Sequence, residues 1–390
     1  MPEEARLPDY SYLPDAQAAL AYSQLPPREL AAVAFAQPVL WPVIPQHPSV
    51  YPELLDWMAQ WAGPEAMAVI EPRRAAFAQA LAAKQLRRAI GKLAGVVALA
   101  IVAMQLVIPL IVELGLMLGI PSLRAAVMGG AANLDEVMAA MAPWLGLVNM
   151  IAALGAASLY LILRGKRLVT TDITTTVPVG DRWGTLAKIA VLFFSVQMFL
   201  ILLMALLSLT GYDPSKAQSE GINPILSSVA GIVYVGFVGP VVEEIIFRGA
   251  ILRHLAPFGV NFAIVTQALL FGLYHMNLYQ GIFAFVIGLL LGYVAINFSI
   301  KWAMLLHIAN NCLGFAPARA EVPLMVVLAL CAIGAIAIAI ADRRRGRPLI
   351  EAGRSDVAHV FHIGWSHPGF IAVVTVLFAI CTAMMFLVGG

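Results

Sequence analysis

The sequence predicts an all-α protein: a polytopic membrane helix bundle of about eight or nine transmembrane helices with a Pro-rich N-terminal extension. Of the 390 residues, 61% are hydrophobic and only 12% are charged, whereas soluble domains carry about 25% charged residues. The mean hydropathy is +0.87. Several apolar runs exceed the ~17 uncharged residues that a spanning helix needs. We therefore expect an integral membrane protein whose first partner is the lipid bilayer.

The first 72 residues are rich in proline and aromatic side chains and hold no apolar run of the ~18 residues that a membrane span requires. Two short helices are expected near residues 28–36 and 53–62, the second with apolar residues at amphipathic spacing. We interpret residues 1–85 as an extension with short amphipathic helices, at the protein surface or along the membrane.

A series of apolar runs follows this extension. The 301–316 run is short and the 278–298 run follows its neighbour almost directly, so the number of spans stays at about eight or nine. The runs lie at about 93–120, 144–163, 186–210, 224–250, 258–276, 278–298, 301–316, 322–341 and 368–388.

Basic residues gather in three places, at 87–88, 164–167 and 343–347. Nine spans with the N-terminus inside put all three on the cytoplasmic side, as the positive-inside rule requires. The chain is Ala-rich with short loops, which we interpret as typical of a bacterial protein. The expected location is the bacterial cytoplasmic membrane, with a cytoplasmic N-terminus.

Several classes of function are disfavoured. The net charge of +2 and the lack of a basic patch interleaved with aromatic residues argue against nucleic-acid binding. The three cysteines contain no C-x-x-C pair, so neither a disulfide framework nor a thiolate metal site is expected. The N-terminus lacks the pattern of a signal peptide.

Two glutamates and an arginine interrupt one apolar run, as Glu243, Glu244 and Arg248. A charge at membrane depth costs roughly 2.5–3.5 kcal/mol on insertion scales. Residues i and i+4 share a helix face, so Glu244 and Arg248 are expected to form an ion pair. Glu243 faces elsewhere and is left for chemistry. The alternative is that both glutamates pair with cations of other helices.

His275 lies as far from the next expected turn as Glu243 does. The turn is predicted at 257–259, and Glu243 precedes Phe258 by 15 residues whereas His275 follows it by 17. At 1.5 Å per residue, both lie roughly 22–26 Å from the turn. An antiparallel hairpin therefore brings Glu243 and His275 to a similar height.

His307 and Asn311 share one helix face, whereas Asn310 points away. Both side chains can donate hydrogen bonds to one oxygen, which suits an oxyanion that develops on a carbonyl. The alternative is an interhelical polar clamp, worth only ~0.6 kcal/mol on average in membranes. Counted from a turn near Ser299, His307 rises only ~12 Å, so it is expected to lie lower than Glu243.

These three motifs together resemble the CPBP family, which includes the type II CAAX prenyl endopeptidases and bacterial bacteriocin-processing and immunity proteins. The family pattern is E-E-x-x-x-R, then F-x-x-x-H, then H-x-x-x-N. It stands here as Glu243-Glu244-Ile-Ile-Phe-Arg248, Phe271-Gly-Leu-Tyr-His275 and His307-Ile-Ala-Asn-Asn311.

The resemblance covers residues 180–340 and implies an intramembrane endopeptidase that acts on a membrane-associated peptide or protein. Residues 86–179 would then form N-terminal transmembrane helices, residues 180–341 the catalytic core, and residues 342–390 a basic cytoplasmic loop with a C-terminal transmembrane helix. The Ala-rich, short-looped chain favours processed bacterial peptides or membrane proteins over prenylated CAAX substrates.

The resemblance also implies roles for five catalytic residues. Glu243 with His275 would activate the attacking water, and His307 with Asn311 would stabilise the tetrahedral oxyanion. Glu244, paired with Arg248, would hold the helix.

A metal is the open point of this mechanism. Glu243, His275 and His307 could supply the three ligands of a catalytic zinc, but there is no H-E-x-x-H motif and the ligands come from three separate spans. We favour metal-free chemistry, with zinc as the alternative.

Two other functions stay open. A catalytically inactive immunity or scaffold protein would keep the same fold. A proton-coupled transporter would also place carboxylates and histidines in the membrane, but it should show symmetric repeats, and none stands out here.

Overall fold

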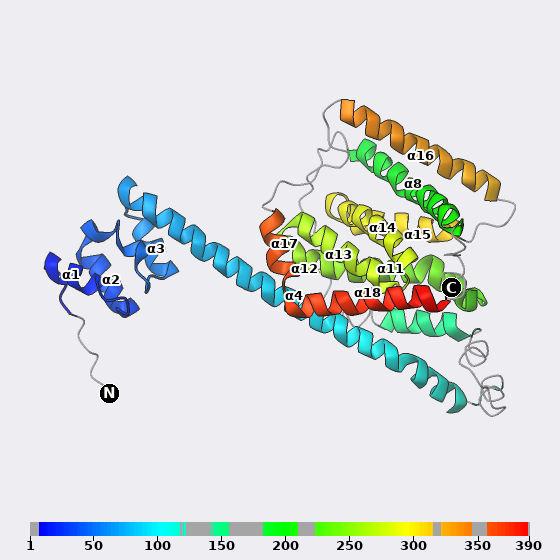
Figure 1. Cartoon of the computed structure of the whole chain (residues 1–390), viewed down its shortest axis with the longest axis horizontal. Helices are drawn as coiled ribbons and strands as arrows, with labels where there is room; N and C mark the ends of the chain where they lie inside the picture. Colours follow the sequence, from blue (N-terminus) through cyan, green and yellow to red (C-terminus); the bar gives the residue numbers. More distant parts are fainter. Residues whose placement is uncertain are drawn as a thin grey trace. The chain divides into compact units, whose positions relative to one another are not determined.

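The computed structural model describes residues 8–117, 119, 121, 142, 144–155, 182–209, 223–314, 321–344 and 357–388. Every regular element among these residues is a helix (Figure 1). The chain divides into two compact units, Met1–Leu86 and Arg87–Gly390. The predicted all-α class of helical membrane bundle is confirmed.

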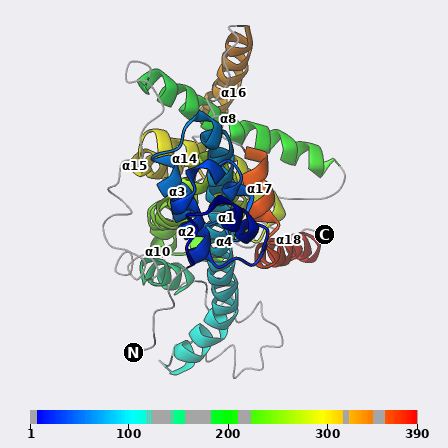
Figure 2. The ribbon, with the colours of Figure 1, turned by 90° about the vertical axis from the view of Figure 1, so that its left-hand side faces the viewer.

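The first unit is a small cluster of short helices, whose ribbon faces the viewer in Figure 2. It has its own buried core. Helix α2 begins at Pro27 and α3 at Pro52, because proline has no N–H to lose at the first helical position. The helices are α1 (Leu13–Leu20), α2 (Pro27–Ala36), η1 (Pro38–Leu40), η2 (Ile44–Gln46), α3 (Pro52–Ala59) and the start of α4 (Pro64–Met117).

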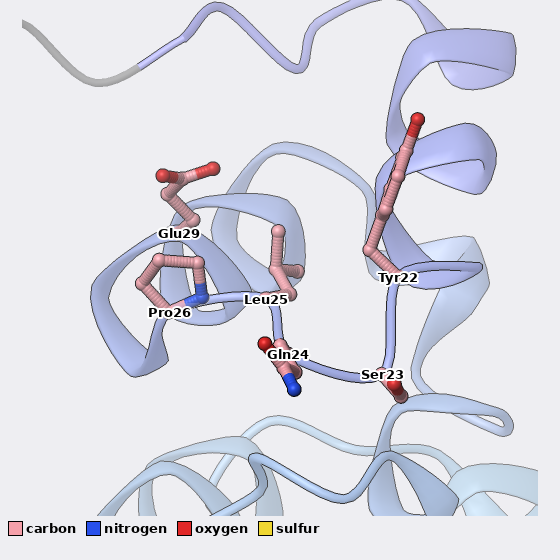
Figure 3. Close-up of a pocket in the computed structure, with 6 residues that line it drawn as sticks. All are labelled: Tyr22, Ser23, Gln24, Leu25, Pro26 and Glu29. Atoms are coloured by element: carbon pink, nitrogen blue, oxygen red, sulfur yellow. The ribbon is translucent and has the colours of Figure 1, made fainter.

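A pocket of about 460 Å³ lies on the connection between α1 and α2 (Figure 3). His47 holds this connection, with Nε2 3.0 Å from the carbonyl oxygen of Tyr22. The pocket contains none of the residues that the sequence analysis singled out. Its lining residues are Tyr22, Ser23, Gln24, Leu25, Pro26 and Glu29.

The second unit holds the remaining helices. Its central part is formed by α13 against α14 and by α11 against α15. Its helices are α8 (Arg182–Ser208), α10 (Val229–Val233), η4 (Tyr234–Val238), α11 (Gly239–Glu244), η5 (Ile245–Leu252), α12 (Arg253–Leu255), η6 (Ala256–Phe258), α13 (Val260–Tyr274), α14 (Leu278–Asn297), α15 (Ile300–Leu313), α16 (Glu321–Arg344), α17 (Val357–Trp365) and α18 (Pro368–Val388).

Within the described residues, four helices are long and apolar enough to cross a membrane, or five if the bent pair α17–α18 counts as one span. The predicted runs 258–276 and 301–316 form helices of 15 and 14 residues, which is shorter than expected. Parts of the runs 93–120 and 144–163 lie outside the described residues. The four long helices are Arg182–Leu206, Val229–Phe258, Leu278–Asn297 and Val322–Arg344.

Close packing of α13 and α14 depends on small residues. A Cβ added at Gly288 would lie 3.1 Å from the Cα atom of Ala268, and one at Gly272 would lie 2.6 Å from the carbonyl oxygen of Gly281. Small residues let helix backbones approach closely in membranes. This approach brings the Gly288 carbonyl within reach of side chains of the site.

Helix α8 packs against α16 and α14 (Figure 1). Lys188 on α8 forms an ion pair with Asp342 on α16. On α14, the Tyr279 hydroxyl donates to the carbonyl oxygen of Leu200 at 3.3 Å. These polar contacts fix the register of α8 against its two neighbours.

Candidate active site

The glutamate segment, residues 234–252, carries Glu243 and Glu244 and is not a regular α-helix. Helix α11 lies between two π-helical stretches, η4 and η5. π-Helical turns inside α-helices are frequent at functional sites. In η4, the N–H of Gly239 donates to the carbonyl of Tyr234, five residues earlier. In the same register the donor to Val235 would be residue 240, a proline without an N–H. The Val235 carbonyl therefore lacks its π-register donor.

Glu244 and Arg248 form the predicted ion pair, which is confirmed. Arg248 Nη1 donates to Glu244 Oε1 at 2.8 Å, and both side chains are fully buried. The guanidinium also lies 4.4 Å from the centroid of the Phe271 ring, and Nη2 is 3.4 Å from the carbonyl oxygen of Gly288. A buried charge needs such partners, because removing them leaves it uncompensated.

His307 lies between the two glutamates. Its Nδ1 atom is 2.9 Å from Glu244 Oε1, and its Nε2 atom is 3.6 Å from Glu243 Oε2. The carboxylate can only accept, so Nδ1 carries the hydrogen that binds Glu244. Glu244 therefore binds His307 as well as Arg248, which the sequence analysis did not predict.

His307 was expected to lie lower than Glu243, yet the two side chains come within 3.6 Å of each other. The estimate assumed a straight α-helix from Glu243 to the turn. In the structure, residues Ile245–Leu252 are π-helical, and a π-turn holds more residues for the same climb. This stretch removes only part of the expected difference in height, and the side chains of Glu243 and His307 cover the rest, with His307 Nε2 3.6 Å from Glu243 Oε2.

His275 is held by its own helix end. Its Nδ1 atom lies 2.8 Å from the carbonyl oxygen of Phe271, so Nδ1 donates and Nε2 is left as an acceptor in the neutral ring. The predicted turn at 257–259 is present, with α13 starting at Val260.

The ring of Phe271 joins the two histidines. Its centroid lies 4.9 Å from that of His275 and 5.7 Å from that of His307, both edge to face. Phe247, four residues after Glu243, packs on the same ring at 5.0 Å. One aromatic side chain thus sets the positions of His275, His307 and the glutamate segment.

Asn311 reaches the glutamate segment from α15. Its Nδ2 atom donates to the Val235 carbonyl at 2.9 Å, which is the carbonyl that Pro240 leaves without a π-register donor. The second hydrogen on Nδ2 is not needed for this bond. Asn310, expected to point away, contacts Asn311 and a residue of α8, Gln197.

Gln197 was missed by the sequence analysis. It is an uncharged amide in the long apolar run of α8, outside all three motifs. A polar residue inside a membrane span is a signal in itself, and applying this rule to every apolar run would have found it.

A metal centre does not fit the described residues. No three His, Cys, Asp or Glu side chains of this part of the chain come together as metal ligands. Both nitrogens of His307 face carboxylates. We therefore route no step of the chemistry through a metal.

The fold and the site define an integral membrane protein with a buried cluster of carboxylate, guanidinium and imidazole groups. Residues 225–313 match the model of the family described as "Type II CAAX prenyl endopeptidase Rce1-like". This match supports the resemblance to the CAAX-type intramembrane proteases of the CPBP family that the three motifs carry. The matched segment is less than a quarter of the chain, and it contains all three motifs.

The N-terminal unit has a match of its own. Residues 14–74 match the model described as a leucine rich repeat variant domain. Searches of curated proteins and of solved structures gave no match to the chain.

Proposed function

We propose that this chain is an active intramembrane endopeptidase that hydrolyses a peptide bond in a membrane-associated protein or peptide of the bacterial cytoplasmic membrane. One observation carries the proposal: His307 binds Glu244 through Nδ1 and faces Glu243 with Nε2. The two adjacent glutamates thereby have different tasks. Glu244 orients the imidazole, and Glu243 acts on the substrate.

Water activation falls to Glu243 and His275. The Glu243 side chain is 19% exposed and has no direct hydrogen bond to His307, because 3.6 Å is too long for one. Its carboxylate can accept one proton of a water molecule. The acceptor nitrogen of His275 can hold the other hydrogen. The water oxygen then has a free lone pair for the scissile carbonyl carbon.

Stabilisation of the oxyanion falls to His307 and Asn311. The C=O electrons move onto the carbonyl oxygen as the C–O bond forms, and two N–H donors can meet this charge. Asn311 has one hydrogen beyond the one bound to Val235. His307 can donate from Nε2 only when both ring nitrogens carry hydrogen.

Collapse of the tetrahedral intermediate completes the reaction. The oxyanion electrons re-form the C=O bond, the C–N bond breaks, and the proton held by Glu243 goes to the leaving amine. Glu243 is then a carboxylate again, so it serves first as a general base and then as a general acid. Atoms and charge balance without a cofactor.

The test uses purified full-length protein in lipid nanodiscs with two quenched fluorescent probes, a prenylated peptide that ends in a CAAX sequence and an unmodified transmembrane peptide. We expect cleavage of at least one probe by the wild type. Glu243→Gln should abolish it, while Glu29→Gln in the first unit should leave it intact. Wild-type turnover in the Glu243 variant, or cleavage of neither probe by the wild type, would overturn the proposal.

A further inference from the structure

A chain of three carboxamides connects α8 with the glutamate segment. Gln197 Nε2 donates to Asn310 Oδ1 at 2.6 Å. Asn310 Nδ2 then donates to Asn311 Oδ1 at 3.3 Å, and Asn311 Nδ2 donates to the Val235 carbonyl at 2.9 Å. Asn310 and Asn311 thus each accept from the preceding amide with their oxygen and donate onward with their nitrogen.

The direction of this chain is fixed at one end by the backbone. A carbonyl oxygen can only accept, so the nitrogen of Asn311, and not its oxygen, must face Val235. The oxygen of Asn311 then faces Asn310, which must present its nitrogen, and the oxygen of Asn310 faces Gln197. A reversal of any one amide would set oxygen against oxygen somewhere along the chain.

The other end is fixed by a residue outside the family match, which spans residues 225–313. Gln197 lies in the middle of α8, whose register depends on its contacts with α14 and α16. Asn310 is buried, so an unmade hydrogen bond there is costly. The short 2.6 Å contact supplies that bond.

We infer that Gln197 is a positioning residue: through Asn310 it holds the Asn311 carboxamide with its N–H group, rather than its oxygen, toward the reacting carbonyl. This inference rests on the proposed function for its catalytic consequence. Pro240 contributes at the other end of the chain. Because it has no N–H, the Val235 carbonyl is available to accept the hydrogen bond from Asn311 Nδ2.

Two near-isosteric variants separate orientation from packing. In Gln197→Glu, assayed at a pH at which the new side chain is ionised, a carboxylate replaces the amide donor, so Asn310 must turn its nitrogen toward α8. Asn310 then presents oxygen to Asn311, which drives the Asn311 amide to reverse. In Gln197→Met, the position neither donates nor accepts, and Val235 alone still orients Asn311.

We therefore expect kcat to fall in the order wild type, Gln197→Met, Gln197→Glu. The loss in the Glu variant should approach the ~10²–10³-fold cost of removing one oxyanion donor, with KM unchanged. Ser195→Ala is the control on the same helix, since its hydroxyl donates to the Leu192 carbonyl of α8 itself. It should keep wild-type kcat. Equal losses in the Glu and Met variants would show packing alone and overturn the inference, as would wild-type kcat in the Glu variant.

A second readout does not depend on turnover. With ¹⁵N-labelled asparagine side chains, the Asn311 amide signals are assigned by their loss in Asn311→Asp. We expect them to move in Gln197→Glu and stay in Ser195→Ala. Unmoved signals in the Glu variant would overturn the inference. Signals that move in a protein that cleaves neither probe would overturn the proposed function instead and leave the positioning intact.

Discussion

Nδ1 of His307 and Nη1 of Arg248 bind the same oxygen atom of Glu244, at 2.9 and 2.8 Å. All three side chains are buried. The other oxygen of Glu244 has no hydrogen-bond partner among the described residues. Glu244 therefore links Arg248, its ion-pair partner on the same helical segment, to the imidazole of His307 on α15.

Loss of the Glu244 charge should destabilise the protein. Glu244→Gln keeps the size of the side chain but leaves Arg248 buried without its counterion, which typically costs about 3–5 kcal/mol. We expect a clear drop in the thermal unfolding midpoint of the detergent-purified protein. Glu243→Gln is the matched control, since Glu243 is partly exposed and forms no salt bridge with an arginine of the described residues, and its midpoint should stay near that of the wild type.

Removal of both members of the ion pair should cost less than removal of one. Replacing a buried pair by apolar residues of similar volume is often neutral or stabilising. We expect Glu244→Leu with Arg248→Met to unfold at a higher temperature than Glu244→Leu alone. Equal midpoints would show that the Arg248 charge is not buried as the structure has it.

Phe271 should matter for turnover more than for folding. Phe271→Leu removes a ring that contacts His275, His307 and the Arg248 guanidinium. Replacing a buried phenylalanine by alanine lowers the free energy of unfolding by roughly 3–5 kcal/mol. Replacement by the larger leucine should lower it by less. We expect a lower kcat in the nanodisc assay because two histidines lose their common support. Phe361→Leu, whose ring packs on α17 and α13 instead, is the control.

Gly288 should not tolerate a side chain. Its added Cβ would sit 3.1 Å from both Cα and Cβ of Ala268, so the α13–α14 pair would have to separate. Overpacking of this kind typically costs 1–3 kcal/mol. We expect Gly288→Ala to lower the unfolding midpoint and Gly95→Ala, where nothing lies within 4 Å, to leave it unchanged or raise it.

The first unit should lose stability in alkaline solution. Burial, followed by the hydrogen bond to Glu29, raises the pKa of Tyr10 from 10.0 to about 12. The unfolded chain therefore releases this proton at a lower pH than the folded one, and stability falls as the pH rises from 10.0 to about 12. We expect proteolysis within residues 8–86 to accelerate over that window.

Tyr10→Phe should flatten this alkaline loss. The exposed Tyr12 is the matched control, and Tyr12→Phe should keep the wild-type pH profile. An identical profile in the Tyr10 variant would mean that another group is responsible.

Much of the site followed from spacing. The Glu244–Arg248 pair and the turn before Val260 needed only the helix period and a Pro-Gly signal. The all-α class followed from composition. These features are local, so each could be read from a few neighbouring residues.

The position of His307 could not be derived in this way. It depends on how α15 packs against α11, a tertiary contact. The Asn311–Val235 bond arises from the π-helical stretch η4, and the sequence pattern of an apolar π-helix is the same as that of an α-helix. The role of Gln197 could not be predicted either. It depends on which helix packs beside α15, and no local sequence pattern contains that tertiary contact.

The helices that carry His275 and His307 have 15 and 14 residues, or about 22 and 21 Å at 1.5 Å per residue. The hydrocarbon layer of a bilayer is about 30 Å thick, and a span that is too short is met by local thinning of the lipid. If lipid adjoins α13 and α15, we expect it to thin there and to shorten the path from bulk water to Glu243. Under the proposed function, short-chain lipids should then speed hydrolysis and long-chain lipids slow it.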